Sequence, residues 1–253
     1  MTNFKDYSKY YDLIYKNKDY RSEVKFIMDL LPPEYRGPLR IIDLGCGTGR
    51  YDFILSEYAE YILGVDLSSS MIQIANNLNE EGDYKNLEFV VGNAQTFKTD
   101  GLFNLAISLF HVLSYQNTNE EVLNYFKSIR SNLNKDSFFI FDYWYSPGVN
   151  NIRPENRENQ FEDEELEIIR IANPIEQVNE NIVEVQYSIK VRDKRNNTQT
   201  AFKESHHMRH FSTPEIKMFA ELSGFECIDF KGWMSMDLPG TNDWASVCIA
   251  RAI

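Results

Sequence analysis

Apolar positions follow two different periods that alternate along the chain. Short, nearly continuous apolar runs lie at residues 39–44, 61–65, 87–91, 102–109 and 138–142. Such runs are typical of strands that are buried on both faces of a sheet. Between the runs, apolar residues recur every three or four positions, as they do from Val24 to Leu31. This alternation predicts an α/β fold in which a mostly parallel sheet carries helices on both faces.

The period changes after residue 145. Between residues 183 and 191, Val and Ile alternate with polar side chains, which indicates a strand with one solvent-exposed face. Residues 166–171 and 200–211 are its expected partners, and the polar, acidic residues 153–167 are expected to form a solvated loop. The helical period returns at Ser212, and two more apolar runs follow, at 226–230 and 245–250.

These patterns divide the chain into four segments. We expect helices over residues 1–31 within an N-terminal segment 1–37, a core over 38–145, an antiparallel β insertion over 146–211, and the last helix and last two strands of the core over 212–253. The five buried runs of the core and the two terminal runs make a sheet of seven strands.

Composition and charge narrow the classes of function. The 253 residues are 43% apolar, which is ordinary for a globular protein. With 26 basic and 38 acidic side chains the net charge is −12, so nucleic acid is not an expected partner because its phosphates would be repelled. No apolar run is long enough for a membrane span or a signal segment, and we expect a cytoplasmic protein. Cys46, Cys227 and Cys248 form no CxxC pair, which argues against a zinc site or a disulfide framework.

The segment IIDLGCGTGR, residues 41–50, carries the strongest functional signal. Gly45, Gly47 and Gly49 stand where a buried strand turns into a helix, so the backbone can approach a ligand closely there. Asp66 ends the next strand, where a carboxylate can accept both hydroxyls of a ribose. A dinucleotide-binding motif would have its third glycine at position 50, where this chain has Arg50, so that motif is not met. The negative charge of Asp43 ahead of the glycines suits a cationic aminoacyl-sulfonium ligand better than a pyrophosphate.

These residues resemble the class I S-adenosylmethionine-dependent methyltransferases. The D-x-G-x-G-x-G motif is met from Asp43 to Gly49, and the acidic second motif is met by Asp66 in LGVDLSSSMIQIA. The third motif reads Gly92-Asn93-Ala94, with Asn93 in place of the usual Asp. The resemblance implies a Rossmann-like fold, S-adenosylmethionine as cofactor, and a cofactor-binding set made of Tyr11, Tyr20, Asp43, Gly45, Cys46, Gly47, Asp66, Leu67, Met71, Asn93, Ala94 and Leu109. Cys46 is expected to act there as a small packing residue and not as a nucleophile.

Four further segments resemble the N-methyltransferases of nucleotide-linked deoxyamino sugars. They are DYSKYYDLIYKNKDY, SLFHVLSYQ, FDYWYSPG and ESHHMRHFSTPEI, in the same order along the chain. The resemblance implies that the acceptor is a small molecule whose amine is methylated, that the insertion covers the acceptor site, and that the N-terminal tyrosines close over the cofactor as a lid. It points to His111 and Tyr115 as catalytic candidates and to Tyr143, Trp144, His207 and Arg209 as acceptor-binding candidates. Either His206 or His207, with Arg209, could form a polar wall of the acceptor pocket. Those enzymes carry a His near the position of Tyr115, whereas His111 comes four residues earlier.

Several alternatives stay open at this point. A small-molecule O-methyltransferase would carry the same cofactor motifs, and so would a non-catalytic regulatory protein that binds the cofactor. The sequence does not fix the oligomeric state, and a homodimer is left open. No metal is expected, because strand alternation places His207 opposite His206 and His210 and no cysteine or carboxylate set accompanies them.

Overall fold

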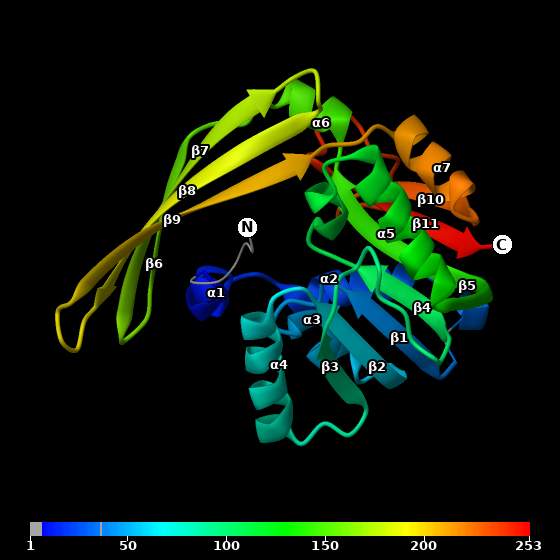
Figure 1. Cartoon of the computed structure of the whole chain (residues 1–253), viewed down its shortest axis with the longest axis horizontal. Helices are drawn as coiled ribbons and strands as arrows, with labels where there is room; N and C mark the ends of the chain where they lie inside the picture. Colours follow the sequence, from blue (N-terminus) through cyan, green and yellow to red (C-terminus); the bar gives the residue numbers. More distant parts are fainter. Residues whose placement is uncertain (1–6, 36) are drawn as a thin grey trace.

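The computed structural model describes residues 7–35 and 37–253. Its main sheet has seven strands in the order β10-β11-β5-β4-β1-β2-β3 (Figure 1). Strands β1 to β5 run parallel, and β11 runs antiparallel to both β5 and β10. The seven strands are β1 (Leu39–Leu44), β2 (Ala59–Asp66), β3 (Leu87–Val91), β4 (Phe103–Ser108), β5 (Leu133–Trp144), β10 (Phe225–Gly232) and β11 (Ala245–Ala252). The predicted seven-stranded, mostly parallel α/β sheet is confirmed.

Helices cover both faces of this sheet, because the buried strands send successive side chains to opposite sides. Ile41 packs in one hydrophobic cluster with α2, α3 and α4, whereas Ile42 packs in another with α5 and α7. The helices are α2 (Tyr20–Leu30), α3 (Arg50–Leu55), α4 (Ser69–Gly82), α5 (Asn119–Ser131) and α7 (Thr213–Leu222). Both α5 and α7 begin at capping boxes, which satisfy backbone N–H groups at their first turns.

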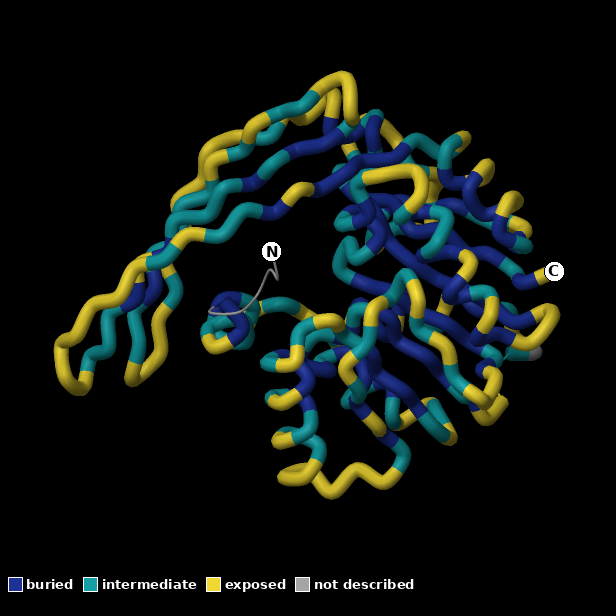
Figure 2. Tube along the Cα trace, viewed as in Figure 1, coloured by how far each residue is buried: buried dark blue, intermediate teal, exposed yellow. Residues whose placement is uncertain are grey.

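The insertion between β5 and α7 is a long, bent antiparallel sheet of four strands, in the order β6-β7-β8-β9. It extends from the core and arches over the short helix α1 (Figure 1). Burial is concentrated in the core and in the neighbouring parts of the insertion, while the hairpin tips are exposed (Figure 2). The elements are α1 (Ser8–Ile14), α6 (Ser146–Asn151), β6 (Arg157–Glu162), β7 (Leu166–Gln177), β8 (Ile182–Asp193) and β9 (Gln199–Arg209), with short 3₁₀ turns η1 (Pro33–Tyr35) and η2 (Val112–Tyr115).

The structure corrects three expectations. Residues 157–162 are not a solvated loop but the edge strand β6, paired with β7; an exposed edge tolerates polar side chains, which also discourage pairing with other chains. The insertion begins with the helix α6, which is too short to show a period. The N-terminal segment holds two helices, with a break at residues 15–19, and the part of the expected helix over residues 1–6 lies outside the described residues.

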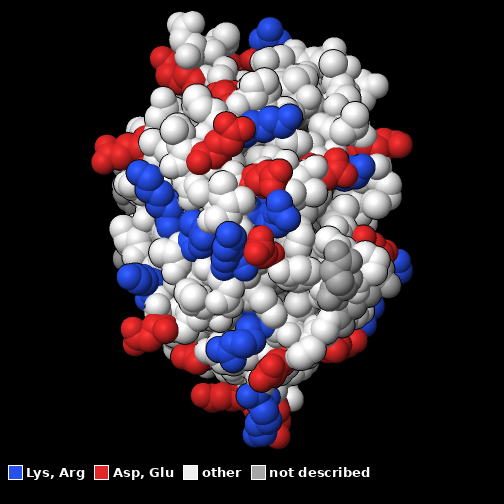
Figure 3. All heavy atoms as spheres, turned by 90° about the vertical axis from the view of Figure 1, so that its right-hand side faces the viewer, with Lys and Arg blue, Asp and Glu red and all other residues white. Residues whose placement is uncertain are grey.

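Two further features concern the apolar character of the helices and the distribution of surface charge. No helix among residues 7–35 and 37–253 is both long and apolar enough to cross a membrane. On the face drawn in Figure 3, Lys and Arg side chains are interspersed with Asp and Glu.

Two carboxyl groups are buried together beneath the glycine-rich turn. Asp43 at the end of β1 is 1% exposed and Asp52 in the first turn of α3 is 0% exposed. The side chain that interacts with the Asp52 carboxyl group by hydrogen bonding is that of Asp43. Burial raises the pKa of Asp52 to about 8, and burial together with the neighbouring carboxylates of Asp52 and Asp66 raises the pKa of Asp43. A proton shared between the two carboxyl groups satisfies both.

This pair predicts a pH-dependent stability. In the unfolded chain Asp52 ionises near pH 3.9, about four pH units below its folded value. The folded state therefore binds more protons between these limits, and the pair loses stability as pH rises from about 4 to about 8. The variant Asp52→Asn cannot ionise. Its free energy of unfolding at pH 8, measured by urea denaturation, should exceed that of the wild type by at least about 1 kcal/mol.

The control for this experiment is Asp29→Asn, at a half-exposed carboxylate paired with Lys25. It should leave the pH dependence of unfolding unchanged. An Asp52→Asn protein that loses stability between pH 4 and 8 as steeply as the wild type would contradict the shared proton.

Candidate active site

A cavity of about 460 Å³ opens at the carboxyl ends of the parallel strands. Its floor comes from the turns after β1, β2, β3 and β4, and its other walls come from α1 and from the insertion strands β8 and β9. In open α/β sheets, ligands bind at this end of the strands. The cavity therefore has a floor made by the core and a roof made by two elements outside it.

The glycine-rich turn after β1 shapes one side of the floor. Gly45 and Gly47 have positive φ angles of 95° and 57°, which side chains with a Cβ rarely adopt. A Cβ on Gly45 would collide with Val112, whereas a Cβ on Gly47 would meet nothing within 4 Å and would project where the cavity lies. The turn thus leaves room for a ligand to lie directly against its backbone.

Asp66 stands at the centre of this side of the cavity. Its carboxylate accepts hydrogen bonds from the backbone N–H of Gly47 at 2.9 Å and of Ser68 at 2.8 Å. Burial raises the pKa of Asp66, and these two N–H groups act in the opposite direction by stabilising its charge. The carboxylate lines the cavity, and its remaining lone pairs suit the two hydroxyls of a ribose.

Nine of the twelve cofactor-binding candidates line the cavity, and three do not. Leu67 is 60% exposed and Met71 is buried below it, so the cavity has an apolar edge next to the Asp66 carboxylate. The cofactor candidates that line the cavity are Tyr11, Gly45, Gly47, Asp66, Leu67, Met71, Asn93, Ala94 and Leu109.

Three cofactor candidates do not line the cavity. Asp43 lies beneath the turn with Asp52, and Cys46 is buried beside Gly64. Tyr20 packs edge-on against Tyr51, with ring centroids 5.0 Å apart. Asp43 and Cys46 are therefore buried next to the cavity, and the Tyr20 ring packs between helices.

The exit of β4 forms the opposite wall. Phe110 and His111 both have positive φ angles, 69° and 67°, a strained conformation for two successive residues with side chains. Asp142 of β5 holds this turn: its Oδ1 accepts from the His111 backbone N–H at 3.0 Å, and its Oδ2 lies 2.6 Å from His111 Nδ1. The side chain of His111 lines the cavity. A buried carboxylate thus orients an imidazole at the wall.

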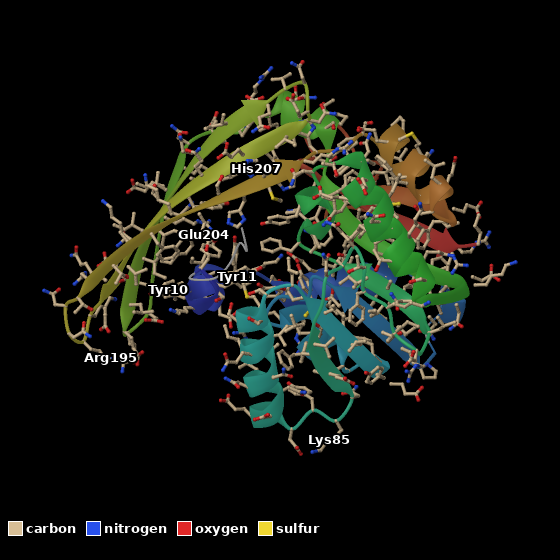
Figure 4. All side chains as sticks on the ribbon, in the orientation of Figure 1. Tyr10, Tyr11, Lys85, Arg195, Glu204 and His207 are labelled. Atoms are coloured by element: carbon tan, nitrogen blue, oxygen red, sulfur yellow. The ribbon has the colours of Figure 1, made fainter. Side chains whose placement is uncertain are left out.

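The insertion contributes a second imidazole, which the sequence alone did not select. His206 of β9 is 3% exposed and lines the cavity. Its Nδ1 lies 2.8 Å from the Tyr115 hydroxyl, and its Nε2 lies 3.2 Å from Glu204 Oε2. Figure 4 shows Glu204 on the side of the insertion that lies toward α1 and Tyr11. Residues 91 positions apart in the sequence therefore meet at one wall.

Helix α1 connects the two halves of the cavity. Arg170 of β7 donates to the hydroxyl of Tyr7 at 2.7 Å and to that of Tyr15 at 3.2 Å. Asp12 of the same helix accepts from the Thr48 hydroxyl at 2.9 Å and from Arg50 Nε at 3.1 Å. The helix segment therefore binds the insertion through Arg170 and binds the glycine-rich turn through Thr48.

Of the four acceptor-binding candidates, only Trp144 lines the cavity. Tyr143 is fully buried against Phe211, because successive residues of β5 point to opposite faces. His207 lies on the other face of β9 from His206, with 47% of its side chain exposed, beside Glu184. Arg209 also lies away from the cavity and packs over Phe211 and near Glu215. Of the two histidines that the sequence left open for a polar wall, His206 lines the cavity, and Glu204 Oε2 lies 3.2 Å from its Nε2.

The chemistry of the lining residues narrows what the cavity can bind. Among the described residues that line it, none is Lys or Arg, and the charged ones are Asp66 and Glu121. Aromatic rings of Tyr7, Phe110 and Tyr187 also line the cavity, and such rings favour a cation. Within residues 7–35 and 37–253, no group of three or more His, Cys, Asp or Glu side chains is placed to hold a metal ion.

Known proteins share both the sequence pattern and the fold. A family model described as a methyltransferase domain matches residues 37–206, which is more than half of the chain. The dTDP-3-amino-3,4,6-trideoxy-α-D-glucopyranose N,N-dimethyltransferase of Streptomyces venezuelae is 25% identical over 145 residues, covering 56% of this chain and 59% of that protein.

Two crystal structures match nearly the full length. A S-adenosylmethionine-dependent methyltransferase from Clostridium acetobutylicum superimposes with a TM-score of 0.81 at 20% identity, over 98% of each chain. Streptomyces venezuelae DesVI superimposes with a TM-score of 0.80 at 18% identity, again over 98% of each chain. At these identities the matches establish the fold. The family match and the fold together confirm the predicted class: the chain belongs to the methyltransferase domain family and has the fold of the S-adenosylmethionine-dependent methyltransferases.

Proposed function

We propose that this methyltransferase transfers the methyl group of S-adenosylmethionine to the amine of a small polar acceptor, with a nucleotide-linked amino sugar as first choice. The observation that carries the proposal is the single cavity in which the Asp66 side and the Tyr115–His206 side face each other. Methyl transfer needs the donor and the acceptor in line within one water-poor space, and this cavity holds both halves of such a site.

The cofactor half is supported by the fit between residues and ligand. The Asp66 carboxylate would accept the ribose hydroxyls, and Leu67 and Met71 would contact the adenine. Asn93 and Ala94 line the same end, where the side-chain carbonyl of Asn93 would accept from the adenine amino group. The open space at Gly47 would receive the aminoacyl part against bare backbone. The sulfonium then supplies an activated methyl group, and the protein's task is alignment.

The acceptor half is supported by its lining. Rings of Tyr7, Tyr187 and Trp144 surround the wall that carries Tyr115, and none of the described lining residues is Lys or Arg. This wall suits an amine, which arrives as a cation, better than a phosphate. We propose that the amine and its sugar ring occupy the cavity and that the nucleotide diphosphate stays outside it. The name of the Streptomyces venezuelae relative, an aminosugar N,N-dimethyltransferase, points to the same substrate class.

We also propose roles for the four segments of the chain. The core over residues 38–145, together with 212–253, would bind the cofactor, while the insertion over 146–211 would cover the acceptor. Helix α1 would act as the lid, because its tyrosines line the cavity and its polar contacts reach both the insertion and the glycine-rich turn.

A second candidate function rests on the pairing of His111 with Asp142. Asp142 Oδ2 lies 2.6 Å from His111 Nδ1 and favours a proton on that nitrogen, so that Nε2 can accept a proton. A hydroxyl acceptor usually needs such a base. This arrangement favours an O-methyltransferase as the alternative.

The cofactor role of Asp66 gives a direct prediction. Replacing it in Asp66→Ala removes charge-assisted hydrogen bonds to the ribose and should weaken S-adenosylmethionine binding by about 1.5–3 kcal/mol. Isothermal calorimetry on both proteins measures this, with the exposed Asp100→Ala as control. Gly47→Val should weaken binding further, because its side chain would fill the open space at the turn. Unchanged affinity in Asp66→Ala would place the cofactor elsewhere.

Metal dependence separates this proposal from metal-assisted O-methylation. We expect dialysis against a chelator to leave methyl transfer intact, because the sulfonium is already activated and the described residues form no metal-binding group. The measurement is turnover before and after dialysis. A loss that magnesium restores would contradict the expectation.

The acceptor atom is tested at His111. If the nucleophile is an amine, His111→Asn at pH 9 should cost less than the roughly hundredfold that loss of a general base causes. Turnover would be measured with a dTDP-linked 3-amino-3,4,6-trideoxyglucose and with its 3-hydroxy analogue. Methylation of the hydroxy compound alone, abolished in His111→Asn, would establish the O-methyltransferase instead.

A further inference from the structure

The wall opposite the cofactor side contains a connected series of three polar side chains from two separate elements. Tyr115 of η2 contacts His206 of β9 at 2.8 Å, and His206 contacts Glu204 of the same strand at 3.2 Å. Side-chain exposure is 4% for His206 and 11% for Glu204. Tyr115 and His206 both line the cavity, and Glu204 lies next to His206 outside the lining.

The chemistry of the partners fixes where the protons lie. A carboxylate can only accept, so the His206 nitrogen that faces Glu204, Nε2, carries the hydrogen. In the neutral imidazole Nδ1 is then the acceptor, and the Tyr115 hydroxyl must donate to it. Burial raises the pKa of Tyr115 well above its ordinary value, which keeps the hydroxyl protonated. Glu204 Oε1 also accepts from the backbone N–H of Tyr7 at 3.3 Å, in keeping with a carboxylate.

An amine acceptor meets an obstacle that this series removes. Alkyl amines with pKa values between about 8 and about 10.4 are mostly protonated at pH 7, and a protonated nitrogen has no lone pair for attack. A group in the cavity that takes a proton from the bound ammonium would allow the abundant form of the amine to react. Tyrosine can accept a proton on its oxygen only if its own proton leaves at the same time, and His206 is in place to receive it.

We propose that Tyr115, His206 and Glu204 form a proton relay that converts the bound acceptor from ammonium to neutral amine. This proposal rests on the proposed function, since only an amine acceptor carries such a proton.

The relay balances in protons and electrons. The ammonium N–H bond breaks toward the Tyr115 oxygen and its electron pair stays on nitrogen, while the Tyr115 proton moves to His206 Nδ1. His206 becomes an imidazolium beside the Glu204 carboxylate, which offsets the new charge. The nitrogen lone pair then forms the bond to the methyl carbon as the bond from carbon to sulfur breaks and its pair returns to sulfur. The product leaves as the methylammonium, and His206 returns its proton to solvent.

The groups around the relay suit this transfer. The rings of Tyr7 and Tyr187 pack against His206 with centroids 6.1 Å and 5.2 Å away. They shield it without providing a competing charge, since burial raises the pKa of both tyrosines. Titratable or charged groups near the relay are Tyr11 in α1, Tyr7 and Tyr15 at its two ends, Tyr187 in β8, Arg170 in β7, and Asp66 at the end of β2.

The proton positions can be tested without any substrate. The chain has four histidines, so nitrogen-15 NMR of histidine-labelled protein can resolve the His206 signals by comparison with His206→Asn. We expect protonated Nε2 and unprotonated Nδ1 in the neutral ring, and a changed Nδ1 shift in Tyr115→Phe. A ring protonated on Nδ1 would overturn the relay, because Tyr115 would then accept and could pass no proton on.

The transfer itself is tested by the pH dependence of kcat/KM with the dTDP-linked 3-amino-3,4,6-trideoxyglucose. In Tyr115→Phe, His206→Asn and Glu204→Gln we expect losses of tenfold or more, up to about a hundredfold, at pH 7. The losses should shrink to within about threefold near pH 10, where the amine loses its proton in solution. The matched control is Glu184→Gln, on the opposite face of the same sheet beside Ser205, which should follow the wild type at every pH.

The outcomes separate the relay from the function on which it rests. A loss of equal size at pH 7 and pH 10 would mean that the three side chains only shape the wall, and it would overturn the relay while leaving amine methylation in place. Methylation of the 3-hydroxy analogue with none of the amino sugar would overturn the proposed function. In that case the NMR result still decides whether the protons are arranged as inferred.

Discussion

The carboxylate of Asp66 is held by backbone N–H groups from two different turns, and the site is organised around that contact. Gly47 belongs to the turn after β1 and Ser68 to the turn after β2, so one side chain joins the ends of two adjacent strands. The positive φ of Gly47 directs its N–H toward Asp66 and leaves the space above the turn open. Below, the buried pair of Asp43 and Asp52 supports the same turn without reaching the cavity.

A sheet with helices on two faces provides only a floor, and the remaining walls must come from elsewhere. Here the insertion and α1 supply them, and α1 is fixed by polar contacts on both sides. Arg170 binds its tyrosines from the insertion, while Asp12 binds Thr48 within the glycine-rich turn. Because the helix contacts the turn that would hold the cofactor, the lid role that we propose for it would link cofactor binding to closure of the acceptor side.

The parts of this structure that were predictable from sequence are those that depend on neighbours along the chain. The glycine-rich turn, Asp66 and the order of strands and helices follow from local pattern, since each needs only a few adjacent residues. The wall of the insertion does not. Whether His206 or His207 faces the cavity is decided by the register of β9 on β8 and by the bend of the whole sheet. In the same way, the strand β6 has a polar sequence and exists because β7 offers an edge.

The two imidazoles that line the cavity come from different parts of the protein, His111 from the core and His206 from the insertion. His111 is fixed by Asp142 within the core, on a turn whose two successive positive φ angles are stabilised by the end of β5. His206 is carried by the insertion and contacts Tyr115 of the core, with its Nδ1 2.8 Å from the Tyr115 hydroxyl. Changes in the insertion can therefore alter the acceptor wall while Gly47, Asp66 and the core imidazole keep their places. Under the proposed function His206 would receive the proton of an amine acceptor, and under the O-methyltransferase alternative His111 would act as the base.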